Sequence, residues 1–316
     1  MKQKIFNGLI ILSFLVLFFE VLFHKTLVFD TISYSLNIWI NTLIPSMFPF
    51  FIISDILINY QIINYIPKFI KKYFCKIFKV GEQTISIFFL SLFSGFPSSA
   101  RNIKTLYDQN LITKEEASHA LAFTHFANPL FVLSTIAVLF LNNEKYGYII
   151  LISHYLGNII IGILSRNLYT NNNSNYKPII NKNPNFSNTL IKAIKSSIDT
   201  LLLILGTLTC FLILSSLIIK HLNINPYTSA LIKGILEMTM GLKAISILSL
   251  ADIYKVVIST MFISFGGLAV HLQVLSQLID TKISYQPFLI ARIFHAIISG
   301  SFCYLLFLFF FHLKYL

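Results

Sequence analysis

Long apolar segments joined by short polar connections make up most of the chain. Stretches without Asp, Glu, Lys or Arg include Thr31–Ser54, Gln83–Ala100, Ala117–Asn143, Tyr146–Ser165, Leu201–Ile219, Val256–Ile279 and Ile293–Leu313. Most of them approach the roughly 20 residues that a membrane-spanning helix requires. The pattern therefore predicts an all-α polytopic membrane protein.

Two neighbouring apolar segments are interrupted by residues that disfavour helix. The first ends in SGFPSS, where Gly95 tolerates unusual dihedral angles and Pro97 lacks an amide donor, and Asn128-Pro129 interrupts the second. Interrupted backbone at membrane depth is tolerated only where protein or a water-filled cavity surrounds it. Paired interruptions therefore indicate a solute site of a secondary transporter. The alternative is that these residues only bend two packed helices.

The expected full spans are Ile5–Phe23, Thr31–Ile58, Ala120–Leu141, Tyr146–Ser165, Asp199–Ile219, Lys255–Leu275 and Phe288–Phe311. Ile5–Phe23 is expected to be a retained signal anchor, because basic residues precede it and no small-residue cleavage site follows it. Pro45 and Pro49 are expected to kink or unwind the second span. Gln83–Ala100 and Ser229–Leu250 are predicted re-entrant hairpins, with full spans as the alternative.

The net charge of +12 comes with 56% hydrophobic residues and a mean hydropathy of +0.75. Because the basic residues lie between apolar segments, they indicate orientation in a membrane and not binding of nucleic acid. Tyr65–Lys79 alternates lysines with aromatic and aliphatic residues, which predicts a basic amphipathic helix on the anionic cytoplasmic leaflet. Arg166–Lys195 is rich in asparagine and is predicted to be a flexible cytoplasmic linker.

The two halves of the chain show the same order of elements: a plain span, a hairpin, an interrupted span and a span with one histidine. We therefore predict an N-terminal anchor over 1–30, a first membrane repeat over 31–165, the linker over 166–195 and a second repeat over 196–316. The distribution of basic residues gives the halves opposite orientations, which makes an inverted-topology repeat with broken transmembrane helices. The alternative is that any two halves of this composition can be aligned.

Polar and ionisable residues near the interruptions are the candidate solute-binding groups, because charged groups inside a membrane are costly. Most of the ionisable ones are basic, and the N-termini of broken helices also favour anions, so an anionic solute is expected. Glu237 has three alternative roles: balancing Lys233 or Lys243, coupling a proton, or pairing along a helix face. The predicted set is Gly95, Pro97, Ser98, Ser99, Arg101, Asn128, Glu237, Thr239, Lys243, Gly266, Gly267, His271 and Gln273.

Histidines in apolar spans add a second group of candidates. His154 and His295 are a possible proton relay, with hydrogen bonding between helices as the alternative. His125 and Arg292 are further ionisable residues in apolar segments. Thr113 and Glu116 form a predicted capping box.

No metal, cofactor or enzymatic site is expected. A metal site at Glu116 and His119 lacks a third ligand at helical spacing, and the cysteines (Cys75, Cys210 and Cys303) have neither metal-ligand nor redox spacing. The sequence contains no Gly-rich phosphate loop, nucleophile elbow or catalytic carboxylate pair.

Several motifs together resemble a family of sporulation integral membrane proteins within the nucleoside-recognition or Gate domain group. They are SGFPSSAR, LITKEEASHALAFTHFANPLF, SHYLGN, GILEMTMGLKAI and SFGGLAVHLQVLSQLIDTKISYQPFLIARIFHA, and the resemblance covers nearly all of the chain after residue 30. It implies a protein of endospore-forming bacteria that lies in the outer forespore membrane and helps to move dipicolinic acid. The Gate group is in turn similar to concentrative nucleoside transporters. The family form expected for the first motif is nearer SGYPVGA, so Ser98 and Ser99 leave the selectivity there open.

The leading hypothesis is a transporter or facilitator of a small organic anion, with Arg101, Lys243 and His271 as charge partners and the two hairpins as gates. The alternatives are a scaffold for spore-envelope assembly that transports nothing, and a nucleoside transporter. The expected partners are membrane lipid and a small anionic solute. The sequence does not predict an oligomeric state.

Overall fold

The computed structural model describes residues 2–168, 185–222 and 224–312, and within these residues every regular element is a helix. Six helices of this described part are long and apolar enough to cross a membrane. The count becomes seven if the bent pair Lys68–Phe78 and Glu82–Ser94 is one span. The prediction of an all-α polytopic membrane protein is confirmed.

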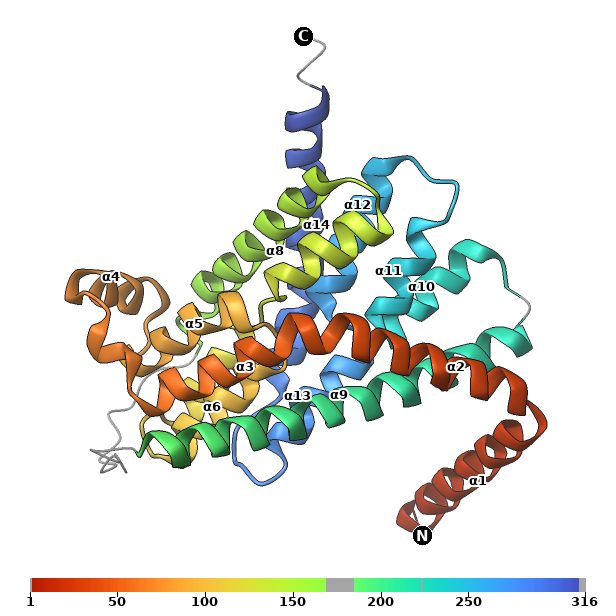
Figure 1. Cartoon of the computed structure of the whole chain (residues 1–316), viewed down its shortest axis with the longest axis horizontal. Helices are drawn as coiled ribbons and strands as arrows, with labels where there is room; N and C mark the ends of the chain where they lie inside the picture. The colour runs from red at the N-terminus through yellow and green to blue at the C-terminus, as the bar shows by residue number, and fades with distance from the viewer. Residues whose placement is uncertain (1, 169–184, 223, 313–316) are drawn as a thin grey trace.

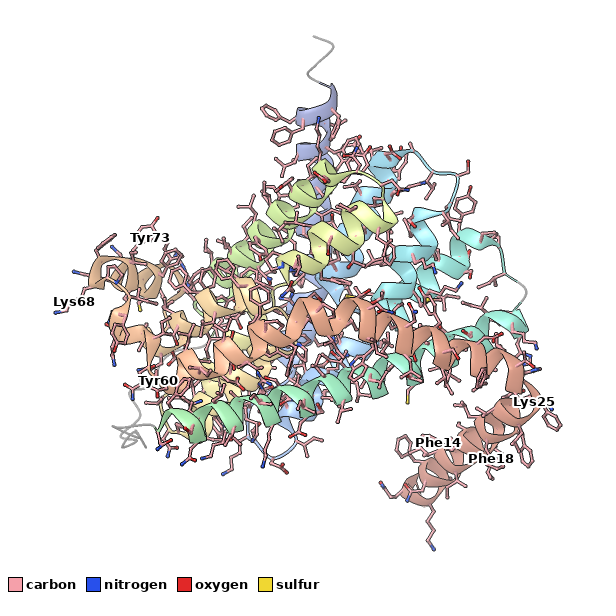
Figure 2. The ribbon with its side chains drawn as sticks, in the orientation of Figure 1. Phe14, Phe18, Lys25, Tyr60, Lys68 and Tyr73 are labelled. Atoms are coloured by element: carbon pink, nitrogen blue, oxygen red, sulfur yellow. The ribbon has the colours of Figure 1, made fainter. Side chains whose placement is uncertain are left out.

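The N-terminal helix α1 (Lys2–Phe23) lies apart from the other helices, at the lower right of Figure 1. Its apolar side chains are exposed, and Figure 2 shows Phe14 and Phe18 on its surface. Such exposure suits a helix surrounded by lipid. The next helix, α2 (Lys25–Ile38), begins at Lys25 and not at the predicted Thr31.

Helix α2 continues through the π-helical segment η1 (Trp39–Leu43) into α3 (Ile44–Asn59). The predicted proline effect is therefore a widened turn just before Pro45, and the helix is not unwound. A widened turn accommodates a ring that removes one amide and crowds the preceding turn. The long helix α9 (Phe186–Leu222) packs along α2 and α3 (Figure 1).

The predicted linker is only partly a linker. Residues 169–184 lie outside the described residues, but 186–195 form the start of α9. Thr189, Ala193 and Ser197 are buried at four-residue spacing, so one small-residue face of this segment packs against the body.

Two pairs of short helices form the predicted hairpins, with different bounds. Hairpin 1 comprises α5 (Glu82–Ser94) and α6 (Ser98–Asp108), and hairpin 2 comprises α10 (Pro226–Leu236) and α11 (Met238–Ser246). These helices have 9 to 13 residues, about 14–20 Å, against a hydrocarbon core of about 30 Å. Neither predicted segment is therefore one straight span.

Two further helices are broken, as predicted. Helix α7 (Lys114–Phe123) is followed by non-helical residues 124–128 and the π-helix η3 (Phe131–Phe140). Helix α12 (Asp252–Phe265) meets α13 (Gly267–Leu278) at Gly266. Each broken pair precedes a long helix, α8 (Glu144–Ser165) or α14 (Gln286–His312), and these two pack together and against α12 (Figure 1). The element order of the predicted repeat is present, whereas the membrane orientation of the halves stays a prediction.

Helix α4 (Lys68–Phe78) follows the 3-10 turn η2 (Ile62–Tyr65) and bends by 94° into α5. Phe69 and Tyr73 are exposed on it, and Figure 2 shows Lys68 and Tyr73 at the edge of the molecule. Lys71 instead turns inward and pairs with Glu82 at 2.6 Å. The predicted amphipathic helix is confirmed, and its contact with a leaflet stays a prediction.

Candidate functional site

The four interruptions of the helices meet in one place. A Cβ added to Gly95, at φ +75°, would lie 2.8 Å from the backbone nitrogen of Asn128. One added to Gly267, at φ +70°, would lie 2.9 Å from the backbone nitrogen of Met238. One added to Gly266 would lie 3.6 Å from His125 Nε2. Residues 95–97, 124–128, 237–238 and 266–267 therefore form a single central junction, where glycine is needed for both conformation and close approach.

The guanidinium of Arg292 binds the carbonyl ends of the two broken helices beside this junction. Its Nη2 donates to Ala122 O at 2.6 Å, and its Nη1 lies 3.4 Å from Ser264 O and 3.5 Å from His125 O. The ends of α7 and α12 leave carbonyl groups without helical partners, and a cation is favourable there. Arg292 is fully buried, and none of the ion pairs among the described residues includes it.

Two more of its bonds define the state of the neighbouring histidine. Arg292 donates to Asn158 Oδ1 at 2.8 Å and to His295 Nδ1 at 2.7 Å. Because an arginine only donates, His295 Nδ1 is the acceptor and its Nε2 donates to His154 O at 2.8 Å. His295 is thus held as one neutral tautomer.

His154 is held in the same way, with the opposite tautomer. The amide of Ala127 donates to its Nε2 at 2.9 Å, so Nδ1 carries the proton and donates to Ser264 Oγ at 3.0 Å. His154 thereby ties α8 to the interruption at 124–128 and to α12, whereas His295 ties α14 to α8. These contacts favour hydrogen bonding between helices. The proton relay stays a prediction.

Arg101 is buried on α6, and its charge is matched within the protein. Its Nη2 pairs with Asp55 on α3 at 2.8 Å, and its Nη1 donates to Thr200 Oγ1 on α9 at 2.8 Å. Asp55, which directly follows the charge-free stretch Thr31–Ser54, is not among the predicted site residues. Arg101 therefore fixes hairpin 1 to two neighbouring helices, and it would have to leave Asp55 to bind an anion.

Glu237 caps helix α11, and among the described residues it forms no ion pair with a lysine. Its carboxylate accepts from the amides of Thr239 at 3.1 Å and Met240 at 2.9 Å, at the N-terminus of α11. The predicted pairing with Lys233 or Lys243 is therefore wrong in this conformation. The carboxylate also occupies the helix end at which an anionic solute was expected.

Lys243 lies away from the junction. It is exposed on α11, and its ammonium sits 4.4 Å from the ring centroid of Tyr34. Its expected role as a charge partner in the site is not supported by this placement.

His271 binds the end of α12 from α13. Phe265 O lies 3.0 Å from His271 Nε2, and a carbonyl oxygen only accepts, so Nε2 carries the proton and donates. His271 Nδ1 therefore accepts from the hydroxyl of Tyr285, whose pKa burial raises to about 12. Gln273 donates to Thr207 Oγ1 on α9 at 2.8 Å, which connects α13 to the long helix.

The remaining predicted residues lie at or beside the junction. Asn128 donates to Phe93 O at 2.9 Å and accepts from the Phe131 amide at 3.2 Å, so it joins hairpin 1 to η3. Pro97 precedes α6, the Ser98 hydroxyl donates to Ser94 Oγ at 2.6 Å, and Ser99 is buried. Thr239 is buried in the first turn of α11.

Glu116 does not close the predicted capping box in full. The Thr113 hydroxyl accepts from its amide at 3.1 Å, as expected. Its carboxylate instead accepts from the Gly81 amide at 2.7 Å and the Thr84 hydroxyl at 2.5 Å. Glu116 therefore binds hairpin 1 to α7.

Several buried polar atoms have no hydrogen-bond partner in the described structure, among them Arg101 Nε on α6. Two of them, His125 Nε2 and Arg292 Nε, belong to side chains that contact the junction. The His125 ring is stacked on Phe96 at 4.5 Å between centroids and touches Phe288 edge-on at 4.9 Å. Arg292 lies over the same Phe288 ring. Because unpaired buried polar groups are costly, these two are the best candidates for solute contact. His125 and Arg292 were recognised from the sequence as ionisable residues in apolar segments, but they are not in the predicted solute-binding set.

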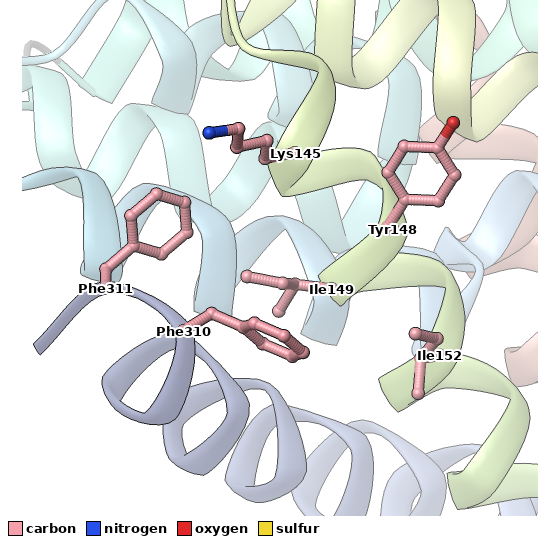
Figure 3. Close-up of a pocket in the computed structure, with 6 residues that line it drawn as sticks. All are labelled: Lys145, Tyr148, Ile149, Ile152, Phe310 and Phe311. Carbon is pink, nitrogen blue, oxygen red and sulfur yellow. The ribbon is translucent and has the colours of Figure 1, made fainter. Parts of the chain in front are cut away.

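A pocket lies away from the junction, between α8 and α14 (Figure 3). It has a volume of about 330 Å³ and is lined by Lys145, Tyr148, Ile149, Ile152, Phe310 and Phe311. None of the predicted site residues lines it. At the central junction, in contrast, Gly95 and Gly267 are packed against backbone, so the interruptions are closed in this conformation.

No family model matches the chain, and no solved structure matches it. The chain is 27% identical to the sporulation integral membrane protein YlbJ of Bacillus subtilis (strain 168), over an alignment of 342 positions that covers 95% of this chain and 83% of that protein. The chain is therefore similar to that protein along almost its whole length, and its membrane-length helices make it an integral membrane protein.

Proposed function

We propose that this chain is a sporulation membrane protein that moves a small organic anion across the membrane. The name of its Bacillus subtilis relative supports a role in sporulation. The convergence of four helix interruptions beside a fully buried arginine without a carboxylate partner among the described residues supports transport of an anion. Interrupted helices at membrane depth are the usual setting of a transporter's solute site.

The solute is proposed to bind between the tip of hairpin 1 and the break of α7. There His125 Nε2 and Arg292 Nε offer two unused polar groups, and Phe96 and Phe288 offer aromatic faces. A planar aromatic dicarboxylate can replace Phe96 on the His125 ring while a carboxylate accepts from the guanidinium. Dipicolinate, the solute implied by the family resemblance, has this chemistry.

Access is proposed to alternate by movement of the two hairpins. Separation of Gly95 from Asn128 opens the junction beside hairpin 1, and separation of Gly267 from Met238 opens it beside hairpin 2. The ion pair of Arg101 with Asp55 is proposed to hold hairpin 1 against α3 in the closed state. The solute contributes by binding one state more tightly than the other.

The test is uptake of labelled dipicolinate into liposomes that contain the purified protein. Wild type is expected to exceed empty vesicles. His125→Phe keeps the aromatic contacts but removes the ring nitrogen, so a roughly tenfold slower uptake is expected from one lost hydrogen bond of about 1.4 kcal/mol. Lys243→Gln, at an exposed site, is the matched control and should be unaffected.

Two outcomes would replace the proposal. Folded protein without uptake above empty vesicles would favour the scaffold. Uptake that uridine or adenosine blocks, while other carboxylates do not, would favour nucleoside transport.

A further inference from the structure

A polar cluster outside the central junction links the exposed helix α1 to the end of α9. Glu20 lies in the last turn of α1, His24 lies between α1 and α2, and His221 lies in the last turn of α9. Glu20 Oε2 lies 2.7 Å from His221 Nε2 and 3.3 Å from His24 Nε2. One ligand atom from each residue lies within 4.8 Å of the other two.

We propose that Glu20, His24 and His221 bind a divalent transition-metal ion, with zinc as the reference ion. Two imidazoles and one carboxylate form an established zinc ligand set that leaves the fourth position to water. Metal–ligand distances of about 2.0–2.2 Å place the ligand atoms of a tetrahedral site about 3.3–3.6 Å apart. The three ligand atoms lie within 4.8 Å of one another, so the site needs shifts of about 1 Å. Glu20 Oε2 and His221 Nε2 must move apart from 2.7 Å, and the more distant atoms must approach, which these partly exposed side chains allow.

Lys220 sets a condition on this site. Its ammonium donates to His24 Nδ1 at 2.8 Å, so in this state the proton of the His24 ring is on Nε2. Metal binding through Nε2 requires the other tautomer, with the proton on Nδ1. Lys220 must therefore release His24 when the ion binds, and its exposed side chain is free to turn into solvent.

The ion would fix the position of α1. The apolar side chains of this helix are exposed, and Glu20 joins it to His24 and His221. A shared ion would turn these hydrogen bonds into a rigid bridge between the first helix and α9. The inference is independent of the solute at the central junction.

Zinc binding by the full chain, purified without a histidine tag and stripped with chelator, tests the proposal. One zinc ion per chain is expected from metal analysis and titration calorimetry. Glu20→Gln and His221→Ala should each weaken binding at least tenfold. Lys220→Gln should tighten it about tenfold, because its amide oxygen can accept from His24 Nδ1 and such supporting bonds change affinity by 10–100-fold. Lys25→Gln is the matched control and should leave the affinity unchanged.

A second measurement follows the position of α1. Spin labels on Leu12→Cys and the native Cys210, with the other cysteines replaced, report the distance between α1 and α9. Zinc should narrow the distance distribution in the protein with native ligands and leave it unchanged in His221→Ala. Zinc affinity that neither His221→Ala nor Lys220→Gln alters, or an unchanged distance distribution with zinc bound, would overturn the proposal.

Discussion

Replacement of Arg292 by methionine should destabilise the protein strongly, because three close acceptors would lose their donor. The guanidinium lies within 2.8 Å of Ala122 O, His295 Nδ1 and Asn158 Oδ1. At the average of about 0.6 kcal/mol for a hydrogen bond between membrane helices, three bonds contribute about 2 kcal/mol. At about 1.5–3 kcal/mol for bonds to a charged group they contribute about 4.5–9 kcal/mol.

The higher figure is too large for the net effect. Arg292 carries a buried charge without a carboxylate partner among the described residues, and its removal recovers part of the cost of burying that charge. Methionine also fills most of the space of the arginine stem, so the cavity is small. We therefore expect the free energy of unfolding to fall by about 2–5 kcal/mol.

Unfolding in mixed micelles with increasing dodecyl sulfate, followed by circular dichroism, measures this change. In Arg292→Lys the free energy of unfolding should fall by about half as much, since one ammonium cannot reproduce the forked donors of a guanidinium. Lys192→Met, on an exposed face of α9, is the control and should stay within about 0.5 kcal/mol of wild type. A loss below about 0.5 kcal/mol for Arg292→Met would refute the role of Arg292 in holding the broken helices.

Three further predictions concern the hairpins and α4. Gly266→Ala and Gly267→Ala each place an alanine at positive φ, which costs about 1–2 kcal/mol. Only Gly267→Ala adds a clash with backbone, so its melting temperature should fall further than that of Gly266→Ala. Equal shifts of the two melting temperatures would contradict the contact with hairpin 2. Asp55→Asn and Arg101→Gln should each cost about 3–5 kcal/mol, and the double variant clearly less than the sum; an additive cycle would mean that the ion pair is unimportant. In Phe69→Trp, with the native tryptophan removed, brominated anionic lipid should quench the fluorescence of the new tryptophan more than brominated neutral lipid does. Equal quenching by the two lipids would argue against binding of the basic helix α4 to an anionic leaflet.

The positions of the breaks could be predicted from the sequence because local chemistry determines them. Gly95 followed by Pro97 disfavours a continuous helix, and so do the two successive glycines Gly266 and Gly267; all three glycines have positive φ. Hairpin 1 was expected for that reason, and hairpin 2 because Ser229–Leu250 carries too many charges for a lipid-facing span; the bounds of both differ from the expected ones. The start of α9 was missed because an asparagine-rich composition concealed the four-residue spacing of Thr189, Ala193 and Ser197.

The partners of the charged groups could not be predicted in the same way. Arg101 meets Asp55 across a tertiary contact, and Arg292 meets main-chain carbonyl groups, which leave no mark in a sequence. Glu237 was different, since an acidic residue just before a short helix is a capping signal that could have been recognised. The ionisable residues of apolar segments were found, but their tautomers and bonds depend on neighbours from other helices.

Access to the central junction is the most direct test of the account. A single cysteine at Ser99, which is buried in the closed state, would be labelled in membrane vesicles with an impermeant maleimide applied from one side and then the other. We predict labelling from both sides in turn over time, and slower labelling when dipicolinate is added. Absence of labelling from either side in folded protein, or labelling from a single side that dipicolinate does not change, would contradict a solute path through the broken helices.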